Sequence, residues 1–279
     1  MSIKLSVGIV TRNRPDSLER TLLSLSKQDP QPYEVIVSDD SQDAKMIEEN
    51  KKVVEKYGYT YLTGQVKGLY ANRNFVAKHC SGTHIRSMDD DHEFPDENHM
   101  RACIAAIEVE PDVIWTMGEY HPWDETRPIP VTRIPGQLHP KGYSYTPKDL
   151  TTYYGISCGA SLYPRVVFDN NILNVEAYKF GMMFLEYGVR LFKKGYKIKH
   201  LNTTYILHHA EKNDVSISAP DIANGARLFC MFMLSFQHIP TAKNKILTLS
   251  EIAKGLAKKT FSPKLIRESY ANFKKYRNI

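Results

Sequence analysis

The sequence predicts an α/β protein with a mixed, mostly parallel sheet flanked by helices and a helical extension at the C-terminus. Apolar, strand-like runs alternate with segments of helical spacing as far as about residue 210, and polar residues stand where several of these strands end. The remaining residues are mostly of helical spacing. The length of 279 residues, with 42% hydrophobic and 24% charged residues, fits one large globular domain with an appendage.

The first hundred residues alternate between strands and helices. Strands are predicted at 5–10, 33–38 and 59–63, and a further strand runs from 83 into an acidic cluster. Helices are predicted from 15 to about 28, from 43 to 56, at 69–79 and at 95–109. We expect Asp16 or Ser17 to cap the first helix and Gly82 to end the third.

The second half continues with strands at 113–117, 156–163 and 196–206, and with a helix at 178–194. Residues 121–147 are rich in proline, glycine and aromatic residues without periodicity, so they predict a long loop over the sheet edge. Residues from about 219 onward are predicted to be helical, with breaks at Pro240 and Pro263. We therefore divide the chain into residues 1–215 and a basic helical extension, 216–279.

The most informative segment is the acidic cluster that ends the fourth strand, Asp89, Asp90, Asp91 and His92. Neighbouring carboxylates repel one another, and a bound cation relieves that repulsion. Alternate residues of an extended chain share a face, so Asp89 and Asp91 can point the same way. Oxygen ligands of this kind suit Mg²⁺ or Mn²⁺ bound together with a phosphate group. The alternatives are an acidic loop or helix start before Pro95, with His92 either an outer ligand or solvent-facing.

The charge and the cysteines of the chain indicate which partners it binds and where in the cell it works. The net charge is +6, and residues 243–279 hold ten Lys or Arg against two Glu. The cysteines, at 80, 103, 158 and 230, have no metal or redox spacing, which favours free thiols in a reducing cytoplasm. The first residues resemble a strand and not a secretory signal, and no apolar run is long enough to span a bilayer. We therefore expect a cytoplasmic protein.

With these parts in order, the chain resembles the inverting nucleotide-sugar glycosyltransferases of family two, which have the GT-A fold, a Rossmann-like architecture. The matching segments are Val7–Pro15, Glu34–Ser41, Gly68–Asn74 and Met88–Asp91. Their order and spacing match well over about the first hundred residues and more loosely to about 210. The resemblance implies a metal-dependent hexosyltransferase that uses a UDP-linked donor, with a nucleotide-binding half at about 1–100 and an acceptor half at about 101–215.

The resemblance also assigns residues to the donor. Thr11 and Arg12 would border the nucleotide base, and Asp39 would accept a hydrogen bond from the base or the ribose. Arg73, more than Lys67, would approach the diphosphate. The alternatives are a turn hydroxyl for Thr11, an Asx turn for Asp39 and solvated surface charges for the two cations.

The metal site gains its ligands from the same comparison. Asp91 would bind the cation, Mn²⁺ or Mg²⁺, together with Asp89 or, in the other possible register, Asp90, and the motif would hold the diphosphate against the metal. Related enzymes often carry a histidine at the end of the last strand. His208 and His209 both stand there, and we assign His209 to the metal.

The general base is where the pattern departs from the family. An acidic pair is expected shortly before a helical segment, but Met183–Phe184 occupies that position. The nearest carboxylate is Glu186, with Glu176 and Asp169 as upstream alternatives. We assign Glu186 as the base and expect Glu186→Gln to abolish turnover while sparing donor binding. The alternative is a helical ion pair with Arg190, four residues further on.

The acceptor and the partners are predicted from the resemblance and from the basic C-terminal tail. A glycan, a lipid-linked glycan or another hydroxyl compound would accept the sugar. The basic tail could lie on the inner face of a membrane or grip nucleic acid, in which case modified bases would be the acceptor. A nucleotide-sugar-binding protein with a degenerate centre is the main alternative function. A nucleotidyltransferase is disfavoured because no glycine- and lysine-rich loop follows Val10.

Overall fold

The computed structural model describes residues 2–120, 136–148, 155–157, 159–209 and 220–279. Its strands are β1 (Leu5–Thr11), β2 (Glu34–Asp39), β3 (Thr60–Thr63), β4 (His84–Asp89), β5 (His92–Glu93), β6 (Ile114–Tyr120), β7 (Gln137–Leu138), β8 (Ser144–Tyr145), β9 (Ala160–Pro164) and β10 (Ile198–His208). Its helices are α1 (Pro15–Ser26), α2 (Ala44–Lys56), α3 (Leu69–His79), α4 (His99–Val109), α5 (Val166–Asp169), α6 (Met183–Lys193), α7 (Pro220–Phe232), the π-helix η2 (Met233–His238), α8 (Ala242–Ala257) and α9 (Pro263–Tyr276).

The main sheet has eight strands in the order β3-β2-β1-β4-β9-β6-β10-β5. Strands β9 and β5 pair antiparallel with their neighbours, and the other strands run parallel. This is the mixed, mostly parallel sheet that the sequence predicts. The register sets Thr11 beside Asp39 and Val10 beside Asp89, so the carboxyl ends of β1, β2 and β4 lie at one edge.

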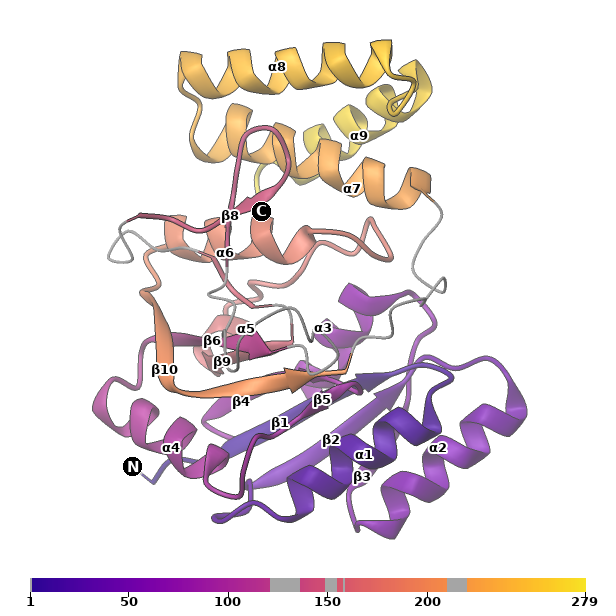
Figure 1. Ribbon diagram of the computed structural model, residues 1–279, viewed down its shortest axis with the longest axis vertical. Helices are drawn as coiled ribbons and strands as arrows, with labels where there is room; N and C mark the ends of the chain where they lie inside the picture. The colour runs from indigo at the N-terminus through magenta and orange to yellow at the C-terminus, as the bar shows by residue number, and fades with distance from the viewer. Residues whose placement is uncertain (1, 121–135, 149–154, 158, 210–219) are drawn as a thin grey trace.

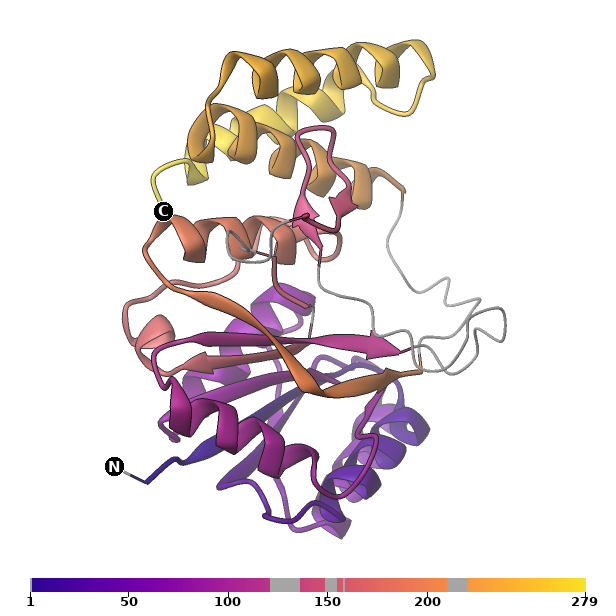
Figure 2. The ribbon, with the colours of Figure 1, turned by 60° about the vertical axis from the view of Figure 1, so that its left-hand side comes forward.

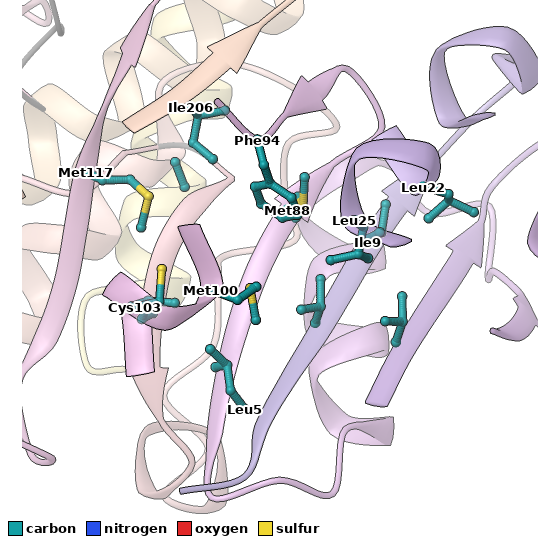
Figure 3. Close-up of a cluster of buried hydrophobic side chains, with 14 of the residues drawn as sticks. Leu5, Ile9, Leu22, Leu25, Met88, Phe94, Met100, Cys103, Met117 and Ile206 are labelled. Atoms are coloured by element: carbon teal, nitrogen blue, oxygen red, sulfur yellow. The ribbon is translucent and has the colours of Figure 1, made fainter. Parts of the chain in front are cut away.

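Strand alternation divides the core between the two faces of the sheet. Val7 and Ile9 of β1 pack with α1, α2 and α4, whereas Val10 packs with α3 on the other face. Helix α1 contributes one buried stripe, Leu18, Leu22 and Leu25. Figure 3 shows this core, including Met88 from β4, Met100 from α4 and Ile206 from β10.

The C-terminal helices form a further layer beyond α6. Figures 1 and 2 show α7, α8 and α9 stacked at the end of the molecule farthest from the sheet. One apolar cluster joins this layer to α6, with members that include Val189 of α6, Phe229 of α7 and Phe273 of α9. The C-terminal helices therefore pack on the α/β part of the chain through a shared core. The predicted boundary near residue 215 lies outside the described residues.

Helix boundaries differ from prediction where tertiary contacts or glycine decide them. Helix α4 begins at His99 and not near residue 95, because Gln28 accepts from the Met100 N–H and donates to the Asp96 carbonyl. Helix α6 begins at Met183, after Gly181 takes a φ of 121° that helices cannot use.

The cap of the first helix, the long loop and the cysteines were also predicted from the sequence. Helix α1 begins at Pro15 without a side-chain cap, so neither Asp16 nor Ser17 has the predicted capping role. The short β7–β8 pair lies within the predicted loop, whose residues 121–135 are outside the described chain. Within the described residues, Cys80, Cys103 and Cys230 are buried free thiols, and no helix has the length and apolar content to cross a bilayer.

Arg86 is the most unusual member of the core. Its side chain is 0% exposed, and burial lowers its pKa. Its Nη1 faces the sulfur atoms of Cys103 and Met117, its guanidinium lies 5.1 Å from the Phe94 ring centroid, and its Nε and Nη2 have no hydrogen-bond partner. No carboxylate among the described residues pairs with this cation, so its burial costs folding free energy.

We expect Arg86→Met to raise the free energy of unfolding by about 1–3 kcal/mol, because it removes unsatisfied buried donors and keeps the volume apolar. Chemical denaturation measures this change. Arg86→Lys is the matched control, since it keeps a buried cation and should give no gain. A Met variant less stable than the parent would contradict this account of Arg86.

Candidate active site

The acidic cluster at the end of β4 is neutralised by cationic side chains from two other elements. Arg73 of α3 places Nη2 2.6 Å from both carboxylate oxygens of Asp89. Arg14, just before α1, places Nη1 3.4 Å from Asp90 and 3.2 Å from Asp91. The protein itself therefore supplies part of the positive charge that three adjacent carboxylates need.

The middle carboxylate, Asp90, is buried and faces β1. The Thr11 hydroxyl donates to it at 2.6 Å. Burial and the neighbouring charge of Asp91 raise the pKa of Asp90 to about 7, although Arg14 and Thr11 oppose this rise. Asp90 thus ties β1 to the cluster, while Asp91 points elsewhere, as alternation along the chain requires.

Asp91 faces two imidazoles. Its Oδ1 lies 3.8 Å from His92 Nε2 and 3.5 Å from His208 Nε2. These are the only three metal-binding side chains that come this close together among the described residues. Burial alone would raise the pKa of Asp91, but the neighbouring His208 and His92 rings and the Arg14 guanidinium lower it. The three ligand atoms lie within 4.8 Å of one another.

His92 is held in the form that binds a metal. Its ring is 0% exposed, and Nδ1 lies 3.0 Å from the Gly159 carbonyl, so Nδ1 carries the proton and Nε2 keeps its lone pair. Burial lowers the pKa of His92, which favours the neutral ring. Gly159 must lack a side chain, because a Cβ there would lie 2.6 Å from Asp89 and 2.9 Å from the His92 ring.

His208 is oriented by a carboxylate from β6. Its Nδ1 lies 3.2 Å from Glu119 Oε2, and Ser157 donates to the other oxygen of Glu119 at 2.8 Å. Burial by itself would lower the pKa of His208, but Asp91 and Glu119 outweigh it and raise the pKa to about 10. A cation that binds Nε2 must therefore displace a proton.

These residues fit a divalent cation. Asp91 Oδ1 and His92 Nε2 are buried atoms without a hydrogen-bond partner, and both face the same point as His208 Nε2. One carboxylate with two imidazoles suits Mn²⁺ better than Mg²⁺, which prefers oxygen ligands alone. Asp89, predicted as a ligand, instead has Arg73 against both oxygens, so it supports the site through charge.

His209, predicted to bind the metal, does not point at this cluster, and the structure brings His208 to Asp91 in its place. Its Nε2 lies 2.6 Å from Glu93, and its backbone N–H donates to the Asp91 carbonyl. Neighbouring residues at the end of a strand point to opposite sides. The geometry therefore gives the ligand position to His208.

The residues predicted to bind the nucleotide lie along the same edge of the sheet, but they differ in whether their polar atoms are free to contact a ligand. Asp39 is 1% exposed, and its oxygens accept from the Ser41 N–H and hydroxyl, from Asn50 and from Tyr61. This arrangement is an Asx turn with extra donors, so no oxygen of Asp39 is left for a base. Arg12 is exposed beside it.

The loop after β3 carries Lys67 toward the same edge. Asp40 accepts from the backbone N–H groups of Val66 and Gly68 at 3.0 and 3.1 Å, which fixes the loop. Lys67 is exposed and has no ion-pair partner within the described residues. Arg73, by contrast, is 6% exposed and paired with Asp89, while its contact with a diphosphate stays a prediction.

A family model for glycosyl transferase family 2 matches residues 6–171, more than half of the chain. The chain belongs to glycosyl transferase family 2. A curated Campylobacter jejuni protein named GalNAc(5)-diNAcBac-PP-undecaprenol beta-1,3-glucosyltransferase is 36% identical over 93 residues. That match covers 32% of this chain and 30% of the relative.

Solved structures have the same fold. S. aureus TarS in complex with UDP-GlcNAc (residues 1–349) superposes with a TM-score of 0.63 and 16% identity over 91% of this chain and 73% of that one. GalNAc-T7 with UDP, GalNAc and Mn²⁺ gives a TM-score of 0.73 and 17% identity, over 99% of this chain and 55% of that one. The full TarS structure is matched over 44% of its length. The predicted GT-A fold is confirmed, and the chain spans less than half of the first curated and structural relatives.

Glu186, predicted as the general base, lies inside this family 2 protein. It is 0% exposed, and its oxygens lie 3.2 and 3.1 Å from Arg190 and 2.9 Å from His238 of η2. Burial would raise the pKa of Glu186, but the charge of Arg190 and the hydrogen bond from His238 lower it. A buried, ion-paired carboxylate has no route to an acceptor hydroxyl, so the helical ion pair replaces catalysis as our interpretation.

Sequence reasoning missed several residues of this family 2 site. Arg14 lies within a matched segment, yet nothing in its spacing links it to Asp91. His92, for which an outer ligand and a solvent-facing ring were the alternatives, is buried against Gly159. Glu119 gave no signal, because its role depends on β6 lying beside β10.

The first prediction from this site separates the two histidines. His208→Ala should weaken Mn²⁺ binding by about tenfold or more, because a ligand is lost, whereas His209→Ala should change it by less than about twofold. Titration calorimetry in the presence of UDP measures both. Equal effects of the two substitutions would contradict the assignment of His208.

The second prediction concerns Glu186. Glu186→Gln should lower the free energy of unfolding by about 3–5 kcal/mol, because it breaks a buried pair, while Glu268→Gln, in an exposed pair with Lys264, should cost less than about 1 kcal/mol. Turnover per folded molecule should stay above about a tenth of wild type. Loss of turnover at unchanged stability would restore Glu186 as the base.

Proposed function

We propose that this protein transfers a sugar from a UDP-linked donor to a hydroxyl acceptor, with inversion and with help from a divalent cation. The observation that carries the proposal is the convergence of Asp91, His92 and His208 at the carboxyl edge of a family 2 fold. The UDP-GlcNAc complex of TarS and the complex of GalNAc-T7 with UDP and Mn²⁺ support the choice of donor and metal.

A divalent cation bound by these three residues would supply Lewis-acid stabilisation of the departing diphosphate. The chain's own contribution is orientation and charge. Gly159 and Glu119 fix the two imidazoles with their Nε2 atoms inward. Arg14, half-buried beside Asp91, and the exposed Lys67 would add positive charge where a diphosphate leaves.

The acceptor is proposed to be a lipid-linked or free glycan hydroxyl. The support comes from the Campylobacter jejuni relative, whose name describes a glucosyltransferase of an undecaprenol-linked glycan. That relative aligns with 32% of this chain, and a screen of lipid-linked and free glycans as acceptors tests this part of the proposal.

We expect the purified protein to release UDP from UDP-glucose, UDP-GlcNAc or UDP-GalNAc in the presence of Mn²⁺, and chelation to abolish this release. Asp91→Asn should reduce release by at least about a hundredfold, because the charged ligand is lost. Asp96→Asn, an exposed acid five residues further on, is the matched control and should leave the rate unchanged. Mn²⁺-independent release of UDP, unaffected by Asp91→Asn, would contradict the proposal.

A second candidate, a nucleotide-sugar-binding protein without transfer activity, is favoured by one observation. Helix α6 begins with Met183 and Phe184 where the family pattern has acids, and its one nearby carboxylate, Glu186, is enclosed. In that case UDP would bind with Mn²⁺ in calorimetry, while no donor would yield UDP above the buffer background.

A further inference from the structure

Helix α8 turns an apolar stripe toward solvent. Ile246, Leu249 and Leu256 are 66%, 55% and 41% exposed, and the exposed Ala242 and Ala253 continue the same row. The spacing alternates between four and three residues, which places all five side chains on one side of a helix. An exposed stripe of this size and regularity is typical of an interaction surface.

A different side of α8, next to the stripe, attaches the helix to the protein. Thr248, Ile252 and Gly255 are buried there. The Thr248 hydroxyl donates to the Pro140 carbonyl at 2.8 Å, and Gly255 lies so close to Phe261 that a Cβ would meet the ring at 2.1 Å. Of the five Ile and Leu side chains of α8, only Ile252 is buried, and Ile246, Leu249 and Leu256 are exposed.

The charges around the stripe are uncompensated. Five lysines lie on α8 or directly after it, and none has an ion-pair partner among the described residues: Lys243, Lys245, Lys254, Lys258 and Lys259. Glu251, the one acid of α8, pairs with Arg227 of α7 at 2.7 Å. At about 100° per residue, Lys243 and Lys254 border one side of the stripe and Lys245 the other.

The position of α8 suits a flat partner. In Figures 1 and 2 it lies across the end of the molecule, on the far side of α7 from the sheet. Its 16 residues extend over about 24 Å, so a planar surface could meet the helix along its whole length.

We propose that α8 docks on the surface of an anionic phospholipid bilayer, with its apolar stripe in the interface and its lysines at the headgroups. Nucleic acid would use the lysines but would leave the apolar stripe in water. A second copy placed stripe against stripe would bring the unpaired lysines of the two helices together. This proposal does not depend on the transfer activity proposed above.

Flotation of the full chain with lipid vesicles tests the proposal. We expect binding to vesicles of mixed phosphatidylglycerol and phosphatidylcholine, with at least about tenfold weaker binding to pure phosphatidylcholine or in high salt. Ile246→Ser combined with Leu249→Ser should weaken binding at least about tenfold, and so should Lys243→Gln combined with Lys254→Gln. All these variants should keep the parent's unfolding midpoint.

Val109→Ser is the matched control, because Val109 is 78% exposed at the end of α4, in the sheet layer and away from α8. It should bind vesicles as the parent does. Equal binding of the parent to neutral and anionic vesicles, or unchanged binding of the serine variant, would overturn the proposal. So would a dimer, detected by light scattering, that the serine variant alone disrupts, or retention on DNA in place of vesicle binding.

Discussion

Three carboxylates in consecutive positions, Asp89, Asp90 and Asp91, set the constraint on which the rest of this site depends. Arg14 lies between Asp90 and Asp91, and each carboxylate also has a partner of its own. Asp89 is held by Arg73, Asp90 by the Thr11 hydroxyl, and Asp91 faces two imidazoles. Because their partners differ, their electrostatic environments differ, and only Asp91 is left with a buried oxygen that has no hydrogen-bond partner.

The sheet order explains how these partners meet. Strand β9 inserts antiparallel between β4 and β6 and brings Gly159 against His92. Strand β6 lies beside β10 and sets Glu119 opposite Ile206, next to His208. The ligand set is thus assembled from the ends of β4 and β10, and its orientation is fixed by groups from β6 and β9. This is how parallel sheets usually present a ligand site, at the carboxyl ends of their strands.

The features of this structure that the sequence predicts depend on local patterns, and those that it does not predict depend on contacts between distant residues. Strands and their ends follow from local patterns, so the edge that carries Thr11, Asp39 and Asp89 was predictable. The choice between His208 and His209 depends on the side of the sheet toward which each side chain points at the end of β10. A pattern of two adjacent histidines cannot specify that side. The enclosure of Glu186 could not be predicted, because its partner His238 lies 52 residues away on a π-helix that has no local sequence signal. The extension, expected as an appendage, shares its core with α6.

The central claim is that Asp91, His92 and His208 bind one divalent cation beside a nucleoside diphosphate. Pulsed electron paramagnetic resonance of Mn²⁺ bound with UDP tests it most directly, because it detects imidazole nitrogens bonded to the metal. The account predicts nitrogen coupling from two imidazoles, one lost in His92→Ala and the other in His208→Ala. Mn²⁺ bound in the ternary complex without any nitrogen coupling would contradict it.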